Sequence, residues 1–208
     1  PTPTPALKNG WYTYGTKNKK YFKDGKYLTG MRKIHGEVYY FSPKGFMKTG
    51  WIKYNDKKYY FGSNGVRCTG VKKISGKYYY FSDKGVLRTK TVKVGNTTYY
   101  CTEKGILEAW KKGSSFYYAN GKKMNSTRAY EYETLQRAKN VVNAITKPSM
   151  SKSQKFETCF RWVMYQHYYE TKRIFHNQTA WPALYAHDYL ILSGKGGDCF
   201  SDACAFAY

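Results

Sequence analysis

The chain has 208 residues, enough for one ordinary domain or two small ones, and it carries 36 Lys and Arg against 13 Asp and Glu, a formal net charge of +23. Aromatic residues make up 19% of the chain, and this excludes a disordered basic tail, which would be poor in aromatic side chains. No apolar run approaches the roughly 18 residues that a transmembrane helix requires, so no membrane span is expected.

The positive charge is concentrated in the first part of the chain. Residues 8–125 hold 26 Lys and Arg against 6 Asp and Glu, whereas residues 126–208 hold 10 against 7. The residue pattern changes at the same place, and this predicts a boundary near residue 125. Residues 1–9, which begin with PTPTP, are expected to be an extended linker remnant without a signal peptide.

Residues 10–125 repeat one pattern about every 20 residues. A mostly aromatic block recurs six times, at 21–22, 39–41, 59–61, 79–81, 99–101 and 116–118. A glycine follows each block, and residues that tolerate positive φ stand where a hairpin turn is needed. The spacing therefore predicts six β-hairpins. Because a lone hairpin is only marginally stable in water, the units are expected to stack into an all-β solenoid with the Tyr and Phe ladder as its core.

This pattern resembles the choline-binding or cell-wall-binding repeat of Gram-positive surface proteins. The third unit carries its elements: Gly50-Trp51, the block Tyr59-Tyr60-Phe61, and the closing Thr-Gly. The resemblance implies a secreted protein of the cell wall. In the choline-binding members, an aromatic cage between consecutive hairpins holds a quaternary ammonium group by cation–π attraction.

The two Trp positions of that cage are only partly kept. The Trp after Gly is present as Trp11, Trp51 and Trp110 and is replaced by Met31, Val71 and Thr91. The position that opens the aromatic block holds Lys19, Val38, Lys58, Tyr78, Thr98 and Phe116. Because a Lys in the cage would repel choline, intact cages are not expected, and choline binding is kept as an alternative function.

The leading hypothesis is that the repeats bind an anionic wall polymer, teichoic acid or another wall glycan. Repeated phosphates would pair with the Lys-rich surface, and exposed rings would stack on sugars. The candidate ligand-binding residues are Trp11, Trp51, Trp110, Tyr40, Tyr60 and Tyr80. A basic surface also fits nucleic acid, but no nucleic-acid motif is present and none is expected as a partner. Five Cys at irregular spacing form no metal motif, so neither a metal nor a cofactor is expected.

Residues 126–208 have a helical pattern. Apolar residues near a 3.6 period predict a helix over 127–145, and a Ser-x-x-Gln capping box predicts a second over 151–167. A shorter helix is expected around 181–192, and a last one begins at Cys199.

The same segment resembles the N-terminal, mainly helical part of a transglutaminase-like, papain-related α+β domain. The resemblance lies in SKSQK from 151, CFRWV from 159, AHDYL from 186 and GKGGDCFSDACAFAY from 194. It implies Cys199 as the catalytic nucleophile of acyl transfer on amides, with a protein or peptide substrate. The family's His and Asp partners follow the Cys helix, so the 208 residues alone are expected to be inactive. The alternative to a wall-bound tether is thus an active thiol peptidase or transglutaminase completed by further residues.

Overall fold

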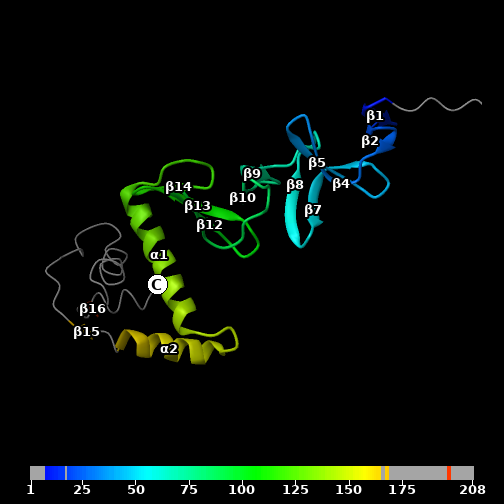
Figure 1. Ribbon diagram of the computed structural model, residues 1–208. Helices are drawn as coiled ribbons and strands as arrows, with labels where there is room; N and C mark the ends of the chain where they lie inside the picture. Colours follow the sequence, from blue (N-terminus) through cyan, green and yellow to red (C-terminus); the bar gives the residue numbers. More distant parts are fainter. Residues whose placement is uncertain (1–7, 17, 165–166, 169–195, 198–208) are drawn as a thin grey trace, which may run out of the picture. The chain divides into compact units, whose positions relative to one another are not determined.

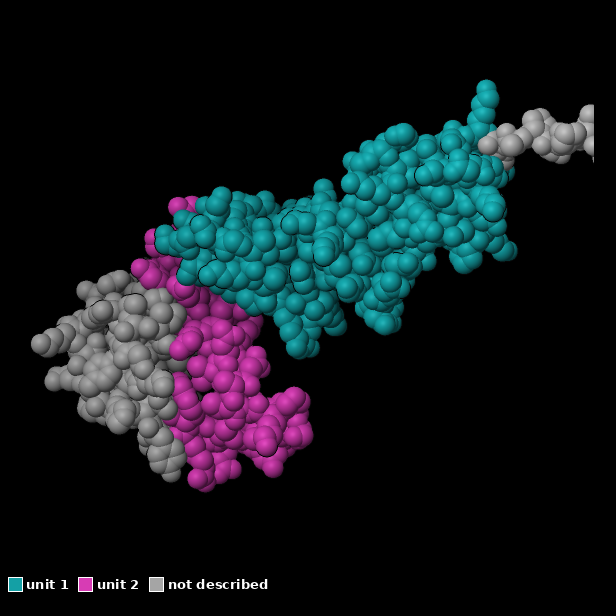
Figure 2. Space-filling view, in the orientation of Figure 1, with its two compact units in different colours: residues 1–122 teal, residues 123–208 magenta. Residues whose placement is uncertain are grey.

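The computed structural model describes residues 8–16, 18–164, 167–168 and 196–197 (Figure 1). The chain divides into two compact units, residues 1–122 and residues 123–208 (Figure 2). The first unit consists of β-strands, and the described part of the second consists of two helices and one short strand pair. Neither described helix is long and apolar enough to cross a membrane.

The first unit is a series of six antiparallel β-hairpins, as the sequence predicts. The paired strands are β1 (Gly10–Tyr14) with β2 (Asn18–Lys23), β4 (Gly30–Ile34) with β5 (Glu37–Phe41), β7 (Gly50–Tyr54) with β8 (Lys57–Phe61), β9 (Gly70–Ile74) with β10 (Lys77–Phe81), β11 (Val92–Val94) with β12 (Thr97–Cys101), and β13 (Leu107–Lys112) with β14 (Ser115–Tyr118). Two short strands, β3 (Lys26–Tyr27) and β6 (Met47–Lys48), extend the first two hairpins, and the last two hairpins join in a four-stranded sheet.

Tight turns of the predicted composition close the hairpins. His35 and Gly36, between β4 and β5, have φ of 48° and 89°, and Asn55 and Asp56, between β7 and β8, have φ of 47° and 56°. Positive φ at both central residues is the turn geometry whose twist matches that of paired strands. Asn, Asp and Gly adopt it at lower cost than most other residues, and in these two hairpins it lets the two strands pair directly.

The core of the unit is built from the aromatic blocks. Phe41, Phe61 and Phe81 end three successive blocks, and each has 0% of its surface exposed. Burying a side chain of this size stabilises the fold by about 1.5–3 kcal/mol. Rings of successive hairpins meet, since the centroids of Tyr40 and Phe61 lie 6.2 Å apart. The predicted aromatic core is confirmed at these positions.

The second unit begins with helix α1 (Ser126–Ile145), one residue earlier than the predicted helix. Its N-cap is Asn125, whose side-chain oxygen accepts a hydrogen bond of 2.8 Å from the backbone N–H of Arg128. Such a cap satisfies an N–H that would otherwise lack a partner in the first turn, a contribution of about 1 kcal/mol.

Helix α2 (Lys152–Met164) begins with the predicted capping box. The Gln154 N–H donates to Ser151 Oγ at 3.2 Å, and the Ser151 N–H donates to Gln154 Oε1 at 2.8 Å. The helix ends at Met164 and does not extend to residue 167 as predicted. Instead, β15 (His167–Tyr168) pairs in parallel with β16 (Gly196–Gly197).

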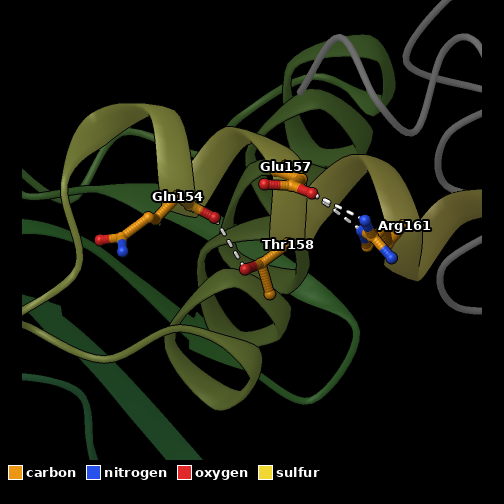
Figure 3. A network of polar contacts seen from close by, with 4 residues as sticks. All are labelled: Gln154, Glu157, Thr158 and Arg161. Atoms are coloured by element: carbon orange, nitrogen blue, oxygen red, sulfur yellow. Dashed lines mark hydrogen bonds and ion pairs between the residues drawn. The ribbon is translucent and has the colours of Figure 1, made fainter.

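Polar contacts one turn apart reinforce α2 (Figure 3). The Thr158 hydroxyl donates to the carbonyl oxygen of Gln154 at 2.7 Å, and Arg161 donates to Glu157 Oε1 from Nε at 3.1 Å and from Nη2 at 2.8 Å. Exposed ion pairs at this spacing contribute about 0.3–0.5 kcal/mol each. These contacts stabilise the helix and form no site. The predicted helices around 181–192 and after Cys199 lie outside the described residues.

Candidate functional site

The first hairpin places a Trp among rings from two consecutive hairpins. Trp11 of β1 pairs across the strands with Tyr21 of β2, and their ring centroids lie 5.3 Å apart. Tyr39 of β5, in the next hairpin, approaches the same Trp at 5.0 Å. Both contacts are edge-to-face, with interplanar angles of 83° and 68°. We call these three residues the Trp11 cluster.

The same arrangement recurs two hairpins further along the chain. Trp51 of β7 lies 5.1 Å from Tyr60 of β8, its cross-strand partner, and 5.0 Å from Tyr79 of β10. The interplanar angles, 69° and 73°, again describe edge-to-face contacts. We call these residues the Trp51 cluster. Phe41 and Phe81, both fully buried, lie 5.8 and 5.9 Å from the respective Trp rings, so the two clusters have equivalent floors.

Both clusters are open to solvent. Trp11 is 38% exposed and Trp51 is 42% exposed. A cavity of about 360 Å³ adjoins the second cluster; its lining comprises Trp51, Ile52, Lys53, Lys58, Tyr79, Leu87 and Lys104. The cavity thus combines aromatic rings, which attract a cation through their negative faces, with lysines that attract an anion.

The lysines of this cavity come from two separate parts of the chain. Lys53 and Lys58 are cross-strand partners in the hairpin that carries Trp51, whereas Lys104 follows β12. Lys53 also forms an exposed ion pair with Asp56 at 3.2 Å. The ammonium groups therefore stand around the aromatic rings and give the cavity a positive rim.

The prediction that Lys19 and Lys58 would prevent intact cages is corrected by this geometry. The third ring of each cluster comes from the following hairpin, as Tyr39 or Tyr79, and not from the cage position one residue earlier, which Val38 or Tyr78 holds. Lys58 pairs with Lys53, two residues along the strand from Tyr60, and it lines the cavity without displacing a ring. Sequence reasoning missed Tyr39 and Tyr79, although their equal offset of 28 residues from Trp11 and Trp51 is visible in the repeat.

The other predicted ligand-binding residues lie outside the two clusters. Tyr40 contacts Tyr54 at 5.5 Å, and Trp110 stacks on Tyr117 with centroids 4.0 Å apart and planes 7° apart. Tyr80 is 6% exposed and belongs to the core. Of the six candidates, the structure brings together Trp51 and Tyr60 in one cluster and places Trp11 in the other.

Tyr80 is stacked on Tyr99 with centroids 3.8 Å apart and planes 9° apart. Burial, reinforced by the nearby Tyr99 hydroxyl, raises the pKa of Tyr80 above its ordinary value. The side chain is therefore a neutral core residue at physiological pH.

A cation is already held by aromatic rings elsewhere in this unit. The ammonium of Lys20 lies 4.3 Å from the ring centroid of Phe46, 4.6 Å from that of Tyr27 and 5.4 Å from that of Tyr14. These distances are within the range of cation–π attraction. The hairpins therefore build an aromatic box around a positive charge when one is supplied by the chain itself.

The proposed nucleophile Cys199 lies outside the described residues, so the structure does not place it. Cys68, Cys101 and Cys159 are described and are free thiols. Within the described part of the chain, no group of three or more His, Cys, Asp or Glu residues is arranged to hold a metal ion.

Two family models match the hairpin unit. A choline-binding repeat matches residues 28–67 and a cell wall binding repeat matches residues 72–87. No curated protein matches the chain.

Several solved structures are similar to the same region. Choline binding protein F from Streptococcus pneumoniae is 30% identical over 56% of this chain and 42% of its own, with a TM-score of 0.47. CbpJ from Streptococcus pneumoniae TIGR4 is 28% identical over 57% of this chain and 46% of its own, also at 0.47. The choline binding domain of Spr1274 from Streptococcus pneumoniae is 31% identical over 38% of this chain and 94% of its own, with a TM-score of 0.35.

The matched region spans less than half of choline binding protein F and of CbpJ. Repeats of this kind indicate a surface protein associated with the cell wall, and the predicted location is confirmed at that level. The hairpin unit therefore consists of repeats of the choline-binding, cell-wall-binding kind.

Proposed function

We propose that the hairpin unit binds choline groups of cell-wall teichoic acid, one in the Trp11 cluster and one in the Trp51 cluster. The observation that carries this proposal is the equivalence of the two clusters, in which a half-exposed Trp meets two Tyr rings at 5.0–5.3 Å. A quaternary ammonium group offers no hydrogen bond, so it is recognised by shape and by the negative faces of aromatic rings.

The lysines around the Trp51 cluster support a polymer-borne choline over free choline. Lys58 and Lys104 stand at the cavity that Trp51 and Tyr79 line, so a bare cation would meet like charges there. A choline carried beside the phosphates of teichoic acid gives these ammonium groups an anionic partner. The anionic-polymer hypothesis and the choline hypothesis are therefore parts of one binding mode.

The relatives support the same ligand. One similar structure is choline binding protein F in the presence of a peptidoglycan analogue, a tetrasaccharide-pentapeptide. Another is the cell-wall endolysin of phage Cp-1, complexed with choline. These ligands belong to those proteins, and for the present chain we infer choline as the recognised group and the wall polymer as its carrier.

The test is the number of choline molecules bound per chain, measured by isothermal titration calorimetry. We expect two for the unmodified protein, one for Trp51→Ala, and none for the double variant Trp11→Ala/Trp51→Ala. Losing one aromatic wall removes a cation–π contact of about 1–2 kcal/mol, and with it roughly a tenfold or larger part of the affinity. Thr91→Ala, at the equivalent position of a hairpin that has no Trp there, is the matched control.

Absence of choline binding by the unmodified protein would overturn the proposal. So would two bound cholines in the double variant. Far-ultraviolet circular dichroism of each variant separates a lost site from a lost fold.

For residues 126–208, we infer from the sequence resemblance a transglutaminase-like segment with Cys199 as nucleophile, tethered to the wall by the hairpins. The support is the residue pattern, which places Cys199 after Gly194-Lys-Gly-Gly-Asp at the start of an expected helix. A cysteine in the first turn of a helix meets unpaired N–H groups, and these lower the pKa of its thiol.

Alkylation by iodoacetamide at about pH 6, read by peptide mass spectrometry, tests this inference, because only a thiol with a lowered pKa forms much thiolate there. We expect Cys199 to react first. Cys101 is the slow internal reference, since burial and the nearby Glu108 carboxylate raise the pKa of its thiol to about 11. Labelling of Cys199 no faster than Cys68 and Cys159, which are half-buried thiols, would contradict a nucleophilic role.

A further inference from the structure

The second hairpin, which lies between those of Trp11 and Trp51 in the chain, has the same strand pairing as they have but different side chains at the cluster positions. Met31 of β4 pairs across the strands with Tyr40 of β5, just as Trp51 pairs with Tyr60. The repeat therefore offers a third position of the same kind, in which Met31 stands where the clusters have Trp. Methionine provides a polarisable sulfur but no aromatic face.

Arg67 reaches this position from the following turn. Its Nη1 lies 3.9 Å from the sulfur of Met31, and its Nη2 donates to the carbonyl oxygen of Asp83 at 3.4 Å. The Nε atom is buried and has no hydrogen-bond partner among the described residues. The guanidinium is thus held against Met31 by its surroundings and is only partly satisfied by hydrogen bonds.

The repeat assigns Arg67 to the same place as Leu87. The Arg67 N–H donates to the carbonyl oxygen of Val38 at 2.8 Å, and the Leu87 N–H donates to that of Lys58, also at 2.8 Å. Leu87 lines the cavity of the Trp51 cluster. Arg67 therefore stands at the corresponding wall of the Met31 interface, with a positive charge where the Trp51 cavity has an apolar side chain.

We propose that Arg67 acts as an internal cation that closes the Met31 interface to choline, so that the protein binds choline only at every second hairpin along residues 10–81. The inference rests on the proposed choline binding and adds which position is closed and by which residue. The guanidinium of Arg67 differs from the lysines that line the Trp51 cavity in its place: it stands at the wall that Leu87 forms in that cavity, 3.9 Å from the Met31 sulfur, and repels a quaternary ammonium group at that point. It also fills space against Met31, much as the Lys20 ammonium already fills its aromatic box.

The first experiment moves the closing group to an open site. Leu87→Arg places a guanidinium in the wall of the Trp51 cavity of the full chain. We expect isothermal titration with choline chloride to give one bound choline instead of two, with the Trp11 cluster retained. Thr89→Arg adds the same charge at an exposed position of the same turn and is expected to keep two.

The second experiment opens the closed position. The double variant Met31→Trp/Arg67→Leu restores a Trp and removes the guanidinium, and we expect three bound cholines. Met31→Trp alone is expected to stay at two, because Arg67 remains.

The number of cholines bound by the unmodified protein tests the proposed function, whereas the variants test the role of Arg67. The two proposals can therefore fail separately. Two sites of unchanged affinity in Leu87→Arg would overturn the role of Arg67. A folded double variant that still binds two cholines would also overturn it. Circular dichroism spectra matching the unmodified protein establish that each variant is folded.

Discussion

Neighbouring aromatic residues of one strand have different roles because a β-strand turns successive side chains to opposite faces. In β8, Tyr59 and Phe61 are 7% and 0% exposed, whereas Tyr60, between them, faces Trp51. The first two contribute to the core and the third to the Trp51 cluster. Within β8, the alternation of side chains along the strand therefore separates core residues from the residue that contacts Trp51.

Glycines of the repeat also differ in what they do. Gly25 and Gly45 have φ of +72° and +77°, a conformation that costs an L-residue roughly 1–2 kcal/mol. A Cβ atom at Gly25 would meet no atom within 4 Å. A Cβ atom at Gly45 would overlap the Cδ2, Cγ and Cβ atoms of Tyr27, which lie at the base of that side chain. Of these two glycines, Gly45 is the one that the close approach of the Tyr27 side chain requires.

We therefore expect Gly45→Ala to destabilise the hairpin unit more than Gly25→Ala does. The backbone cost is common to both variants, and the additional overlap with Tyr27 adds about 1–3 kcal/mol. The difference between their urea midpoints measures the packing term alone. Equal urea midpoints would show that Tyr27 moves aside and that its close approach to Gly45 does not contribute to stability.

At the scale of elements, the sequence predicts those features that depend on residues close together in the chain. The period of about 20 residues predicts the hairpins, and turn residues such as Asn55 and Asp56 predict their turns, because pairing and turn chemistry act over a few residues. The capping box at Ser151 likewise predicts where α2 begins. The sequence pattern predicts a helix to residue 167, three residues beyond the end of α2, because no helix-ending signal stands at Met164.

Contacts between hairpins were beyond the sequence pattern. Tyr79 closes the Trp51 cluster from 28 residues away, and the contact depends on how one hairpin leans on the next. The joining of β12 and β13 into a four-stranded sheet, with a register shift between Tyr100 and Cys101, was not predicted for the same reason. The sequence pattern therefore points to Lys58, the family's cage position, whereas the packing of the hairpins supplies Tyr79.

At the scale of the whole molecule, charge separates binding of the polymer from binding of its choline. The net charge of +23 attracts a polymer with repeated phosphates and repels a free choline cation. In the proposed binding mode the two ligands share the aromatic clusters, so the short-range contacts are the same in both complexes. The two binding free energies differ only in their long-range electrostatic contribution, which is favourable for the polymer and unfavourable for free choline.

Added salt is therefore expected to change the two affinities in opposite directions. Raising NaCl from about 0.05 M to about 0.5 M shortens the screening length to a few ångströms, which removes attraction to the polymer and repulsion of free choline alike. Binding to walls that carry teichoic acid should weaken, and calorimetric affinity for choline chloride should strengthen. The double variant Lys58→Gln/Lys104→Gln, which removes two charges at the Trp51 cavity, should flatten both slopes more than Lys139→Gln/Lys147→Gln, which removes two exposed charges from the helical unit. A choline affinity that falls as salt is added would contradict the like-charge repulsion assigned here to the lysines. Wall binding that ignores salt while choline still displaces the protein would assign the whole attachment to the two aromatic clusters.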